Sequence, residues 1–327
     1  MHVLIAIHHR VQAWTIDAAH VDELRRRFPH LTFLHSTTRE ADSTLAETAD
    51  VAFALSLSKD AVARAARLTW VHCSGHAVGH FPLGDLAARG IVVTNSRGVQ
   101  AIPIAEHVMA CLLALARRLP QTMRDQQQSL WRPNELLGDG SPWLLAGRTL
   151  AVIGTGTIGQ EIAIRAKAFG MRVTGMRRHP ARKAPEGFDE VLGPADRNDL
   201  LAAADVVVVA APLTRETTLL LDAEGIAGLK PGAIVINIAR GQLIDESALA
   251  EALVSGRLGG AALDVFTAEP LPADSPFWSL PNVIVTPHNS GFRAGHFDAV
   301  IDLFSENLTR FQRGLELLNV VDLQSGY

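Results

Sequence analysis

The amino-acid sequence predicts a two-domain α/β protein in which each domain is built on a doubly wound parallel sheet. The chain has 327 residues, about twice the usual length of one domain. Short β-rich runs alternate with runs of helical spacing, and this alternation starts again after residue 148. Alternating strands and helices indicate parallel strands, because each helix carries the chain back across the sheet.

The first hundred residues predict the first domain. Segments such as 18–28 and 59–68 have the apolar spacing of helices, and five runs between such segments have strand character. The N-terminal apolar run, Val3 to Ile7, has no small-residue cleavage pattern, so we expect a buried strand there rather than a signal peptide. The expected strands are residues 2–7, 31–36, 51–57, 68–74 and 91–96.

A long helix is expected next, over residues 102–120, with Pro120 ending it. The polar stretch that follows, residues 121–143, interrupts the pattern and is expected to form an extended arm or loop. Long connections inside compact proteins are usually functional or form interfaces.

A second alternation of strands and helices predicts the second domain. One further helix, residues 298–314, follows it and must pack against one of the two domains. The expected strands are residues 149–154, 172–176, 205–211, 232–239, 259–265 and 282–288.

Composition excludes several classes of function. The net charge is -4 and the pI is near 6.3, so there is no electrostatic reason to expect nucleic acid or an anionic membrane as a partner. No segment approaches the roughly 18 apolar residues of a membrane span, and we expect a cytoplasmic protein. The two cysteines, Cys73 and Cys111, lack metal-ligand spacing, so we expect packed thiols. Four histidines, His8, His9, His72 and His80, also lack such spacing, so we expect no metal.

Residues 149–170, TLAVIGTGTIGQEIAIRAKAFG, place three glycines directly after an apolar strand and at the start of a helix. The first allows a tight turn, the second lets backbone approach a pyrophosphate, and the third lets the helix pack on the strand. The helix N-terminus offers free N–H groups to phosphates. A purely structural turn is the alternative, but the whole context favours a dinucleotide-binding loop. The expected cofactor contacts are Gly154, Thr155, Gly156, Thr157, Ile158 and Gly159.

Arg177 and Arg178 stand where such a chain usually carries an acidic residue, about 20 residues beyond the glycines. An acid there bonds the 2′-hydroxyl of the adenine ribose and repels a 2′-phosphate, whereas a guanidinium binds phosphate oxygens as a bidentate donor. The pair therefore favours NADP(H) over NAD(H) as cofactor. A solvated basic loop, RRHPARK, is the alternative.

Several segments in order resemble the D-isomer-specific 2-hydroxyacid dehydrogenase family, in particular its glyoxylate/hydroxypyruvate reductases. They are NSRGVQAIPIAEHV, GRTLAVIGTGTIGQ, INIARGQLIDESALAEAL, GAALDVFTAEPLP and VIVTPHNSG, and the resemblance extends over nearly the whole chain. It implies two Rossmann-like domains with an active-site cleft between them. The implied domains are a flavodoxin-like substrate domain, residues 1–100 and 291–327, and a dinucleotide-binding Rossmann domain, residues 101–290.

The resemblance implies three catalytic residues: Arg240 in ARG, Glu269 in AEP and His288 in TPH. Their chemistry suits the reduction of a 2-keto acid, in which the carbonyl carbon takes a hydride and its oxygen takes a proton. Imidazole titrates near neutrality and can donate that proton, while a carboxylate on its other nitrogen holds the tautomer. A guanidinium can bind the substrate carboxylate and polarise the keto oxygen. Taken singly, each residue also has a structural alternative, as a loop histidine, a turn-opening glutamate or a surface ion-pair partner.

The same resemblance implies further contacts. Asp264 is expected to bond the nicotinamide carboxamide, or alternatively to cap a turn. The loop SGHAVGH departs from the family pattern SAGVD, whose backbone N–H groups hold the substrate carboxylate. His76, Ala77 and Val78 fall on this loop as substrate contacts, and His76 either touches the substrate or packs. The remaining cofactor contacts are Ala211, Pro212, Thr217, Ile238, Ala239, Ser290 and Gly291, with Arg240 and His288 contacting both cofactor and substrate.

Together these features predict an oxidoreductase that transfers a hydride between NADP(H) and a small 2-keto or D-2-hydroxy acid, of the glyoxylate or hydroxypyruvate reductase type. The alternatives are an NAD-dependent D-2-hydroxyacid dehydrogenase and a dinucleotide-sensing, corepressor-like binding protein. Residues 121–143 resemble the segment through which family members embrace a second subunit, so we expect a homodimer. Trp131 and Trp143 are the candidate interface anchors, although Trp131 could instead cover its own domain.

Overall fold

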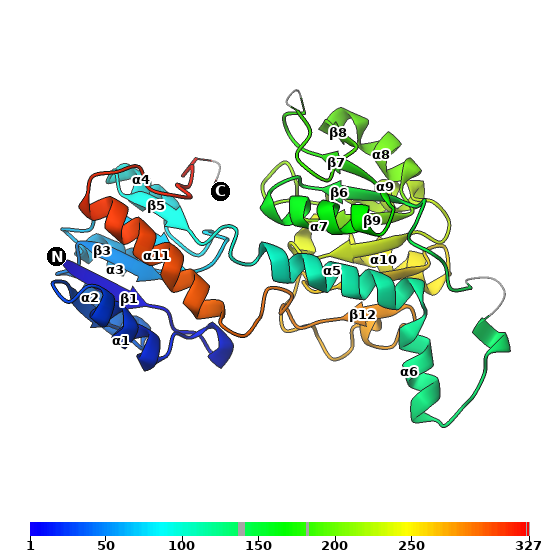
Figure 1. Ribbon diagram of the computed structural model, residues 1–327, viewed down its shortest axis with the longest axis horizontal. Helices are drawn as coiled ribbons and strands as arrows, with labels where there is room; N and C mark the ends of the chain where they lie inside the picture. The colour runs from blue at the N-terminus through cyan, green and yellow to red at the C-terminus, as the bar shows by residue number, and fades with distance from the viewer. Residues whose placement is uncertain (137–140, 181–182, 325, 327) are drawn as a thin grey trace. The chain divides into compact units, whose positions relative to one another are not determined.

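The computed structural model describes residues 1–136, 141–180, 183–324 and 326. The chain divides into two compact units: unit 1 is Met1–Gln100 with Phe292–Tyr327, and unit 2 is Ala101–Gly291. Unit 2 thus ends one residue beyond the expected residue 290. Each unit contains one sheet with parallel strand pairing (Figure 1), which confirms the predicted class of two parallel α/β domains.

Unit 1 has its strands in the order β2-β1-β3-β4-β5. The strand order reverses between β1 and β3, and sheets of this kind bind ligands beyond the carboxyl ends of their strands at such a point. The strands are β1 (His2–Ala6), β2 (Thr32–His35), β3 (Val51–Ala54), β4 (Trp70–Cys73) and β5 (Val92–Asn95). The helices are η1 (Gln12–Trp14), α1 (Ala18–Arg27), α2 (Arg39–Ala46), α3 (Lys59–Arg64), α4 (Leu83–Ala88) and α11 (His296–Gln312).

The two faces of this sheet carry two separate apolar cores. Strand β3 buries all of its residues, as a central parallel strand covered on both faces should. Helix α11, orange in Figure 1, packs on one of these cores, where the ring of Phe304 stacks on Phe53 with centroids 4.1 Å apart. The final helix therefore belongs to unit 1, although all of unit 2 precedes it in the chain.

Unit 2 has its strands in the order β12-β11-β10-β9-β6-β7-β8. The order reverses between β6 and β9, so the loops that follow these two strands meet at one edge of the sheet. The strands are β6 (Thr149–Ile153), β7 (Arg172–Met176), β8 (Glu190–Leu192), β9 (Val206–Val209), β10 (Ile234–Asn237), β11 (Gly260–Leu263) and β12 (Val283–Val285). The α-helices are α5 (Ala101–Ala116), α6 (Leu119–Gln127), α7 (Thr157–Ala168), α8 (Arg197–Ala203), α9 (Ala223–Gly228) and α10 (Glu246–Val254). Short 3-10 helices are η2 (Asn134–Leu136), η3 (Pro194–Asp196), η4 (Gly241–Leu243) and η5 (Pro276–Trp278).

The helix expected to end at Pro120 ends earlier, so that expectation was wrong. Helix α5 stops at Ala116, Arg118 takes a left-handed conformation (φ 56°), and α6 begins at Leu119 with Pro120 in its first turn. Proline suits that place because the first N–H groups of a helix have no partner within it. The expected arm is consequently helical as far as Gln127, and residues 137–140 of it lie outside the described residues. The edge strand β8 was also not expected.

Neither a membrane span nor a metal cluster is found in the described part of the chain. No helix there has the length and hydropathy needed to cross a membrane. No three His, Cys, Asp or Glu side chains there are grouped to hold a metal ion. The two cysteines are free and buried, and burial raises the pKa of Cys73 to about 12 and of Cys111 to about 11. Both are therefore packed thiols that stay protonated near neutral pH.

A buried histidine in unit 1 is held neutral by its surroundings. His72 on β4 is fully buried, and desolvation lowers its pKa to about 3. Ser96 Oγ donates to the carbonyl of Cys73 (3.1 Å), so Nε2 of His72 must donate to Ser96 Oγ (3.2 Å). Thr94 Oγ1 accepts from Trp70 Nε1 (2.9 Å) and donates to Nδ1 of His72 (2.7 Å). Protonation of Nδ1 would break this last hydrogen bond.

This network predicts a loss of stability in acid. The unfolded chain protonates His72 near pH 6.5, whereas the folded protein does so only near pH 3, so the unfolded state binds more protons between these values. The free energy of unfolding should fall by about 2 kcal/mol between pH 7 and pH 5 through this residue. Urea unfolding at several pH values gives the free energy of unfolding of the parent and of a His72→Gln variant. The parent's advantage in this free energy should shrink as the pH falls. An advantage that does not change with pH would contradict the low pKa of His72 in the folded protein.

Candidate active site

The glycine loop follows β6, where the strand order of unit 2 reverses. Gly154 has φ 105°, and a Cβ there would lie 2.7 Å from the backbone of Ala210, just beyond β9. A Cβ on Gly159 would collide with the carbonyl oxygen of Gly154. Both glycines are therefore required by the close approach of the loop to β9 and α7.

The rest of this loop leaves room for a ligand. Gly156 is the N-cap residue of α7, and a Cβ added to it would meet nothing within 4 Å. Gly156 and Thr157 are exposed, and Thr155 and Ile158 are half-buried. An exposed helix N-terminus after a tight glycine turn suits a phosphate group. Residues 154–159 thus fit the pyrophosphate of a dinucleotide.

The two arginines lie beyond the carboxyl end of β7. The N–H of Arg177 donates to the Leu192 carbonyl (3.1 Å), which continues the β7–β8 pairing by one residue. The side chain of Arg177 is half-buried, with Nη2 3.5 Å from the Lys183 carbonyl. Arg178 is exposed, and its Nη2 lies 3.4 Å from Oε2 of Glu216. The structure therefore places a carboxylate beside this basic pair.

The loop after β9 holds its own shape by hydrogen bonds. Thr217 Oγ1 donates to the Pro212 carbonyl (2.7 Å) and accepts from the N–H of Thr214 (2.7 Å). Ala211 is buried and Pro212 is exposed. Since β9 pairs with β6, this loop and the glycine loop leave the same edge of the sheet. Of the expected cofactor contacts in this loop, which are Ala211, Pro212 and Thr217, the first lies against the glycine loop: a Cβ on Gly154 would lie 2.8 Å from the backbone nitrogen of Ala211.

His288, Glu269 and Arg240 come together in unit 2 from three different loops. Nδ1 of His288 lies 2.8 Å from Oε2 of Glu269, and Oε1 of Glu269 accepts the N–H of Phe266 (3.0 Å). Desolvation lowers the pKa of the half-buried Arg240 guanidinium, and the nearby negative charge of Glu269 acts in the opposite direction. An arginine keeps its charge at neutral pH. The arrangement is an imidazole–carboxylate pair beside a fixed cation.

Backbone packing brings the Arg240 turn against the Glu269 loop. A Cβ on Gly241 would collide with the backbone of Phe266 and Thr267, so only glycine permits this approach. Arg240 itself is the extended N-cap residue of η4.

Asn237, buried at the end of β10, supports the Arg240 turn from inside. Its Nδ2 donates to the Arg240 carbonyl (2.9 Å), and its Oδ1 accepts the N–H of Ala239 (3.0 Å). Within this turn Ile238 is buried and Ala239 is half-buried. Asn237 thereby sets the path of the chain on which the catalytic candidate Arg240 lies.

Asp264, directly after β11 and 2% exposed, holds the turn that carries His288. Its Oδ1 accepts hydrogen bonds from Thr286 Oγ1 (2.6 Å) and the N–H of Asn289 (2.9 Å), and its Oδ2 accepts the N–H of Ser290 (3.0 Å). Its carbonyl accepts the N–H of His288 (2.9 Å). These bonds stabilise a left-handed backbone at His288 (φ 53°), which is uncommon for a residue other than glycine. A carboxylate has about four acceptor positions, and the chain itself fills three of them here.

The hydrogen-bond network of Asp264 extends to helix α5. Nε2 of His107 lies 3.3 Å from Thr286 Oγ1, and the Cys111 thiol lies 3.5 Å from the same nitrogen. Burial lowers the pKa of His107, which favours its neutral form. Ser290 and Gly291, the last residues of unit 2, are buried.

The expected substrate loop lies in unit 1 directly after β4. Asn95 Nδ2 donates to the His76 carbonyl (2.7 Å), and the Cys73 thiol lies 3.5 Å from the Ala77 carbonyl. His76 and Ala77 are half-buried, whereas the side chain of Val78 belongs to the apolar core. The backbone of this loop is therefore held by unit 1 itself.

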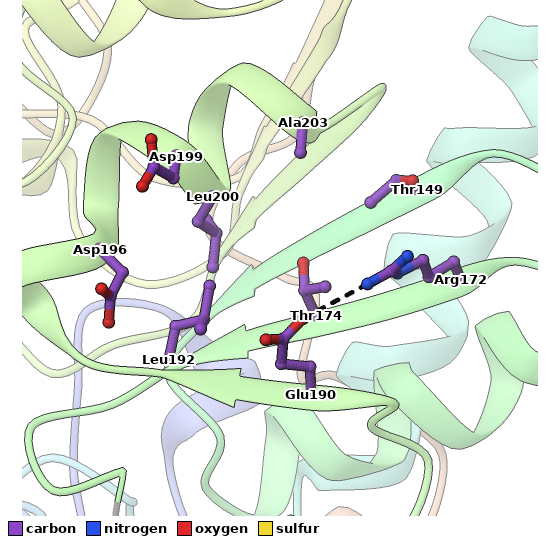
Figure 2. Close-up of a pocket in the computed structure, with 9 residues that line it drawn as sticks. All are labelled: Thr149, Arg172, Thr174, Glu190, Leu192, Asp196, Asp199, Leu200 and Ala203. Atoms are coloured by element: carbon purple, nitrogen blue, oxygen red, sulfur yellow. Dashed lines mark hydrogen bonds and ion pairs between the residues drawn. The ribbon is translucent and has the colours of Figure 1, made fainter.

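A cavity of about 360 Å³ in unit 2 lies away from these residues. Figure 2 shows it between α8 and strands β6, β7 and β8, with the ion pair Arg172–Glu190 (3.3 Å) across the two outer strands. Thr149, Arg172 and Glu190 begin their strands, whereas Leu192, which also lines the cavity, ends β8. None of its nine lining residues is an expected site residue.

A glycine loop at a reversal of strand order, together with an imidazole–carboxylate pair beside a guanidinium, is typical of dinucleotide-dependent dehydrogenases. The comparisons with known proteins agree. Residues 109–290 match the family model described as D-isomer specific 2-hydroxyacid dehydrogenase, NAD binding domain. The chain belongs to the D-isomer specific 2-hydroxyacid dehydrogenase family.

Three relatives illustrate the similarity. A D-3-phosphoglycerate dehydrogenase of Methanocaldococcus jannaschii is 36% identical over 82% of this chain, and the chain spans only 50% of that relative. A glyoxylate reductase of Korarchaeum cryptofilum is 36% identical over 73% of this chain and 72% of its own length. The crystal structure of a D-isomer specific 2-hydroxyacid dehydrogenase from Xanthobacter autotrophicus Py2, in complex with NADPH and MES, is 30% identical, with a TM-score of 0.82 and 99% of each chain covered.

Three residues that shape the site were not expected from the sequence. Asn237 ends an apolar strand in INIARG, and a polar residue there is a usable signal for a turn-supporting amide. His107 and Glu216 have no such signal, because their contacts join distant parts of the chain: His107 meets Thr286, and Glu216 meets Arg178.

The contacts of Asp264 predict the effect of Asp264→Asn. The new amide would turn an NH₂ group toward donors that now meet an oxygen, so stability should fall by about 1–3 kcal/mol. Displacement of His288 should lower kcat by about 10- to 100-fold. Urea unfolding and steady-state kinetics measure the two effects.

Asp205→Asn is the matched control for this variant. Asp205 lies just before β9, at the amino ends of the strands, and its carboxylate accepts the N–H of Thr149 (2.8 Å). The loss of this hydrogen bond should lower stability and leave kcat unchanged. An unchanged kcat in Asp264→Asn would show that Asp264 does not position His288.

Proposed function

We propose that this protein reduces small 2-keto acids to D-2-hydroxy acids, with NADP(H) favoured over NAD(H), and that the reverse oxidation uses the same residues. The observation that carries the proposal is the 2.8 Å contact of His288 Nδ1 with Glu269 beside Arg240. Unit 2 is the proposed dinucleotide-binding domain and unit 1 the proposed substrate domain. The glycine loop and the two arginines would hold the cofactor.

The nicotinamide, when bound, supplies the hydride that the carbonyl carbon accepts. The protein must supply the proton for the keto oxygen. Nδ1–H of His288 donates to Glu269, so Nε2 of the doubly protonated ring is the proton donor in reduction. After the transfer the ring is neutral, and in oxidation the same Nε2 accepts the hydroxyl proton. Glu269 holds the ring orientation and stabilises the imidazolium by its opposite charge.

Arg240 would bind the substrate carboxylate and polarise the keto oxygen. A guanidinium offers two parallel N–H donors in the geometry that a carboxylate accepts. Its half-buried position strengthens such a charge-assisted bond, because the surrounding dielectric constant is lower than that of water. Asn237 and the Gly241 contact hold the turn on which it lies.

Basic side chains in unit 1 support an anionic substrate. Burial first, and then the positive charges of Arg10, His80 and Arg39, lower the pKa of His9. These groups follow β1, β2 and β4, so they gather beyond the carboxyl ends of the strands, as does the loop of residues 76–78. Carboxylate and phosphate groups are the ligands that such a cluster attracts.

The cofactor preference is proposed from the basic pair after β7. Arg177 and Arg178 occupy the place of the acid that would repel a 2′-phosphate, and the 30% identical relative from Xanthobacter was crystallised with NADPH. An NAD-dependent D-2-hydroxyacid dehydrogenase is the second candidate. It is favoured by Glu216, whose carboxylate lies beside Arg178.

A homodimer is proposed through the segment around α6. Trp131 is 92% exposed, and Met123 and Leu144, before and after it in the chain, are 62% and 69% exposed. Aromatic side chains are enriched where subunits meet, so Trp131 is the candidate anchor. Trp143 instead packs within unit 2, under the guanidinium of Arg148 at 5.3 Å. Light scattering should give the mass of two chains, and a monomer would contradict the proposal.

A kinetic screen of small 2-keto acids, with NADPH and NADH in parallel, tests the function. Glyoxylate or hydroxypyruvate should be reduced, with a higher kcat/KM for NADPH than for NADH. Because His288 supplies the proton, His288→Ala should lower kcat by about 10²- to 10⁴-fold while NADPH binding changes little. His30→Ala in unit 1 is the control and should retain parent activity. Turnover of His288→Ala near the parent value would rule out this role for His288.

A further inference from the structure

The exposed carboxylate of Glu216 lies beside Arg178, one of the two arginines that follow β7. Its Oε2 is 3.4 Å from Nη2 of Arg178, and both groups belong to unit 2. The two residues are distant in the chain, one after β7 and the other in the loop after β9. Tertiary structure alone makes them neighbours.

The carboxylate is held in place by its own loop. Thr214 Oγ1 donates to Glu216 Oε2 (2.8 Å). This hydrogen bond, the N–H of Glu216 itself and the charges of Arg178 and Arg215 lower the pKa of the carboxyl group. Glu216 is therefore ionised at neutral pH, and Thr214 and Arg178 orient its exposed carboxylate.

The Arg178–Glu216 ion pair lies where the adenosine half of the proposed cofactor would bind. Strands β9, β6 and β7 are adjacent in the sheet, so the loops after them leave one edge together. They are the loop with Glu216, the glycine loop and the loop with the two arginines. In a doubly wound sheet this edge binds the dinucleotide, with the ribose 2′-position next to the residues that follow the second strand. A negative charge beside Arg178 therefore acts where a 2′-phosphate would bind.

We propose that Glu216 sets the cofactor preference of this protein, because its carboxylate pairs with Arg178 and competes with the 2′-phosphate of NADP(H) for that guanidinium. The inference rests on the proposed use of NADP(H) and adds to it. A phosphate monoester carries roughly -1.5 to -2 charges at neutral pH, so it must displace or tolerate the Glu216 carboxylate. NADH lacks this group and meets no such competition. The Arg178–Glu216 pair thus reduces the difference between the affinities for NADPH and NADH.

Direct binding of each cofactor to the full-length protein tests this proposal. NADPH and NADH are titrated separately into the parent and a Glu216→Gln variant, and nucleotide fluorescence gives the two dissociation constants. The ratio of Kd for NADH to Kd for NADPH should rise by about three- to tenfold in the variant, as expected for one partly screened charge at close range. Glu224→Gln, which removes an exposed acid in the first turn of α9, is the matched control and should leave the ratio unchanged.

A double variant separates competition for Arg178 from general repulsion. In an Arg178→Gln background, the change from Glu216 to Gln should alter the Kd ratio by less than about twofold, because the contested guanidinium is gone. An unchanged ratio in Glu216→Gln, an equal rise in Glu224→Gln, or a full rise in the Arg178→Gln background would each overturn the proposal. These titrations need no turnover. A protein that shows the shift in binding but reduces no 2-keto acid would refute the proposed reaction and leave this inference standing.

Discussion

The catalytic candidate His288 owes its position to one buried carboxylate. Burying a carboxyl group such as that of Asp264, which is 2% exposed, is costly unless hydrogen-bond donors replace its hydration. The chain supplies them from a single short segment, since the donors of Thr286, Asn289 and Ser290 all point at this carboxylate. These hydrogen bonds hold the carboxyl ends of β11 and β12 together and fix the backbone of the turn that carries His288.

The carboxylate of Glu269 interacts with two neighbours, His288 and Arg240. Its Oε2 contacts His288, while its charge offsets the desolvation of Arg240. The imidazole of His288 thus shares one carboxylate with the guanidinium of Arg240. In the proposed reaction the guanidinium of Arg240 attracts the anionic substrate, and Glu269 orients His288, the proposed proton donor. The same carboxylate partly offsets the desolvation of Arg240.

The sequence predicted those features that depend on local spacing. The strand–glycine–helix order at 149–170 is local, and Gly154 and Gly159 indeed make the close contacts that such a loop requires. Strand β8 was missed because it has three residues and lies at the sheet edge, where no apolar alternation marks it. The break between α5 and α6 was misplaced because the left-handed turn at Arg118, rather than Pro120, separates the helices. Contacts such as those of Asp264 and Glu216 could not be predicted, since they arise only when separate strands end at one edge.

The two ends of the proposed cofactor site show opposite uses of an ion pair. At the nicotinamide end, the His288–Glu269 pair would take part in the proposed chemistry, because His288 would carry the proton that is transferred. At the adenosine end, the Arg178–Glu216 pair transfers nothing and only sets how much positive charge a 2′-substituent meets. An arginine without a carboxylate beside it would discriminate more strongly between the two cofactors, because its full charge would favour NADPH, which carries the 2′-phosphate, over NADH. A paired arginine instead keeps its guanidinium oriented at the edge of the site while it offers only part of its charge. The choice of cofactor then depends on a carboxylate in the loop after β9, outside both the glycine motif and the residues that follow β7.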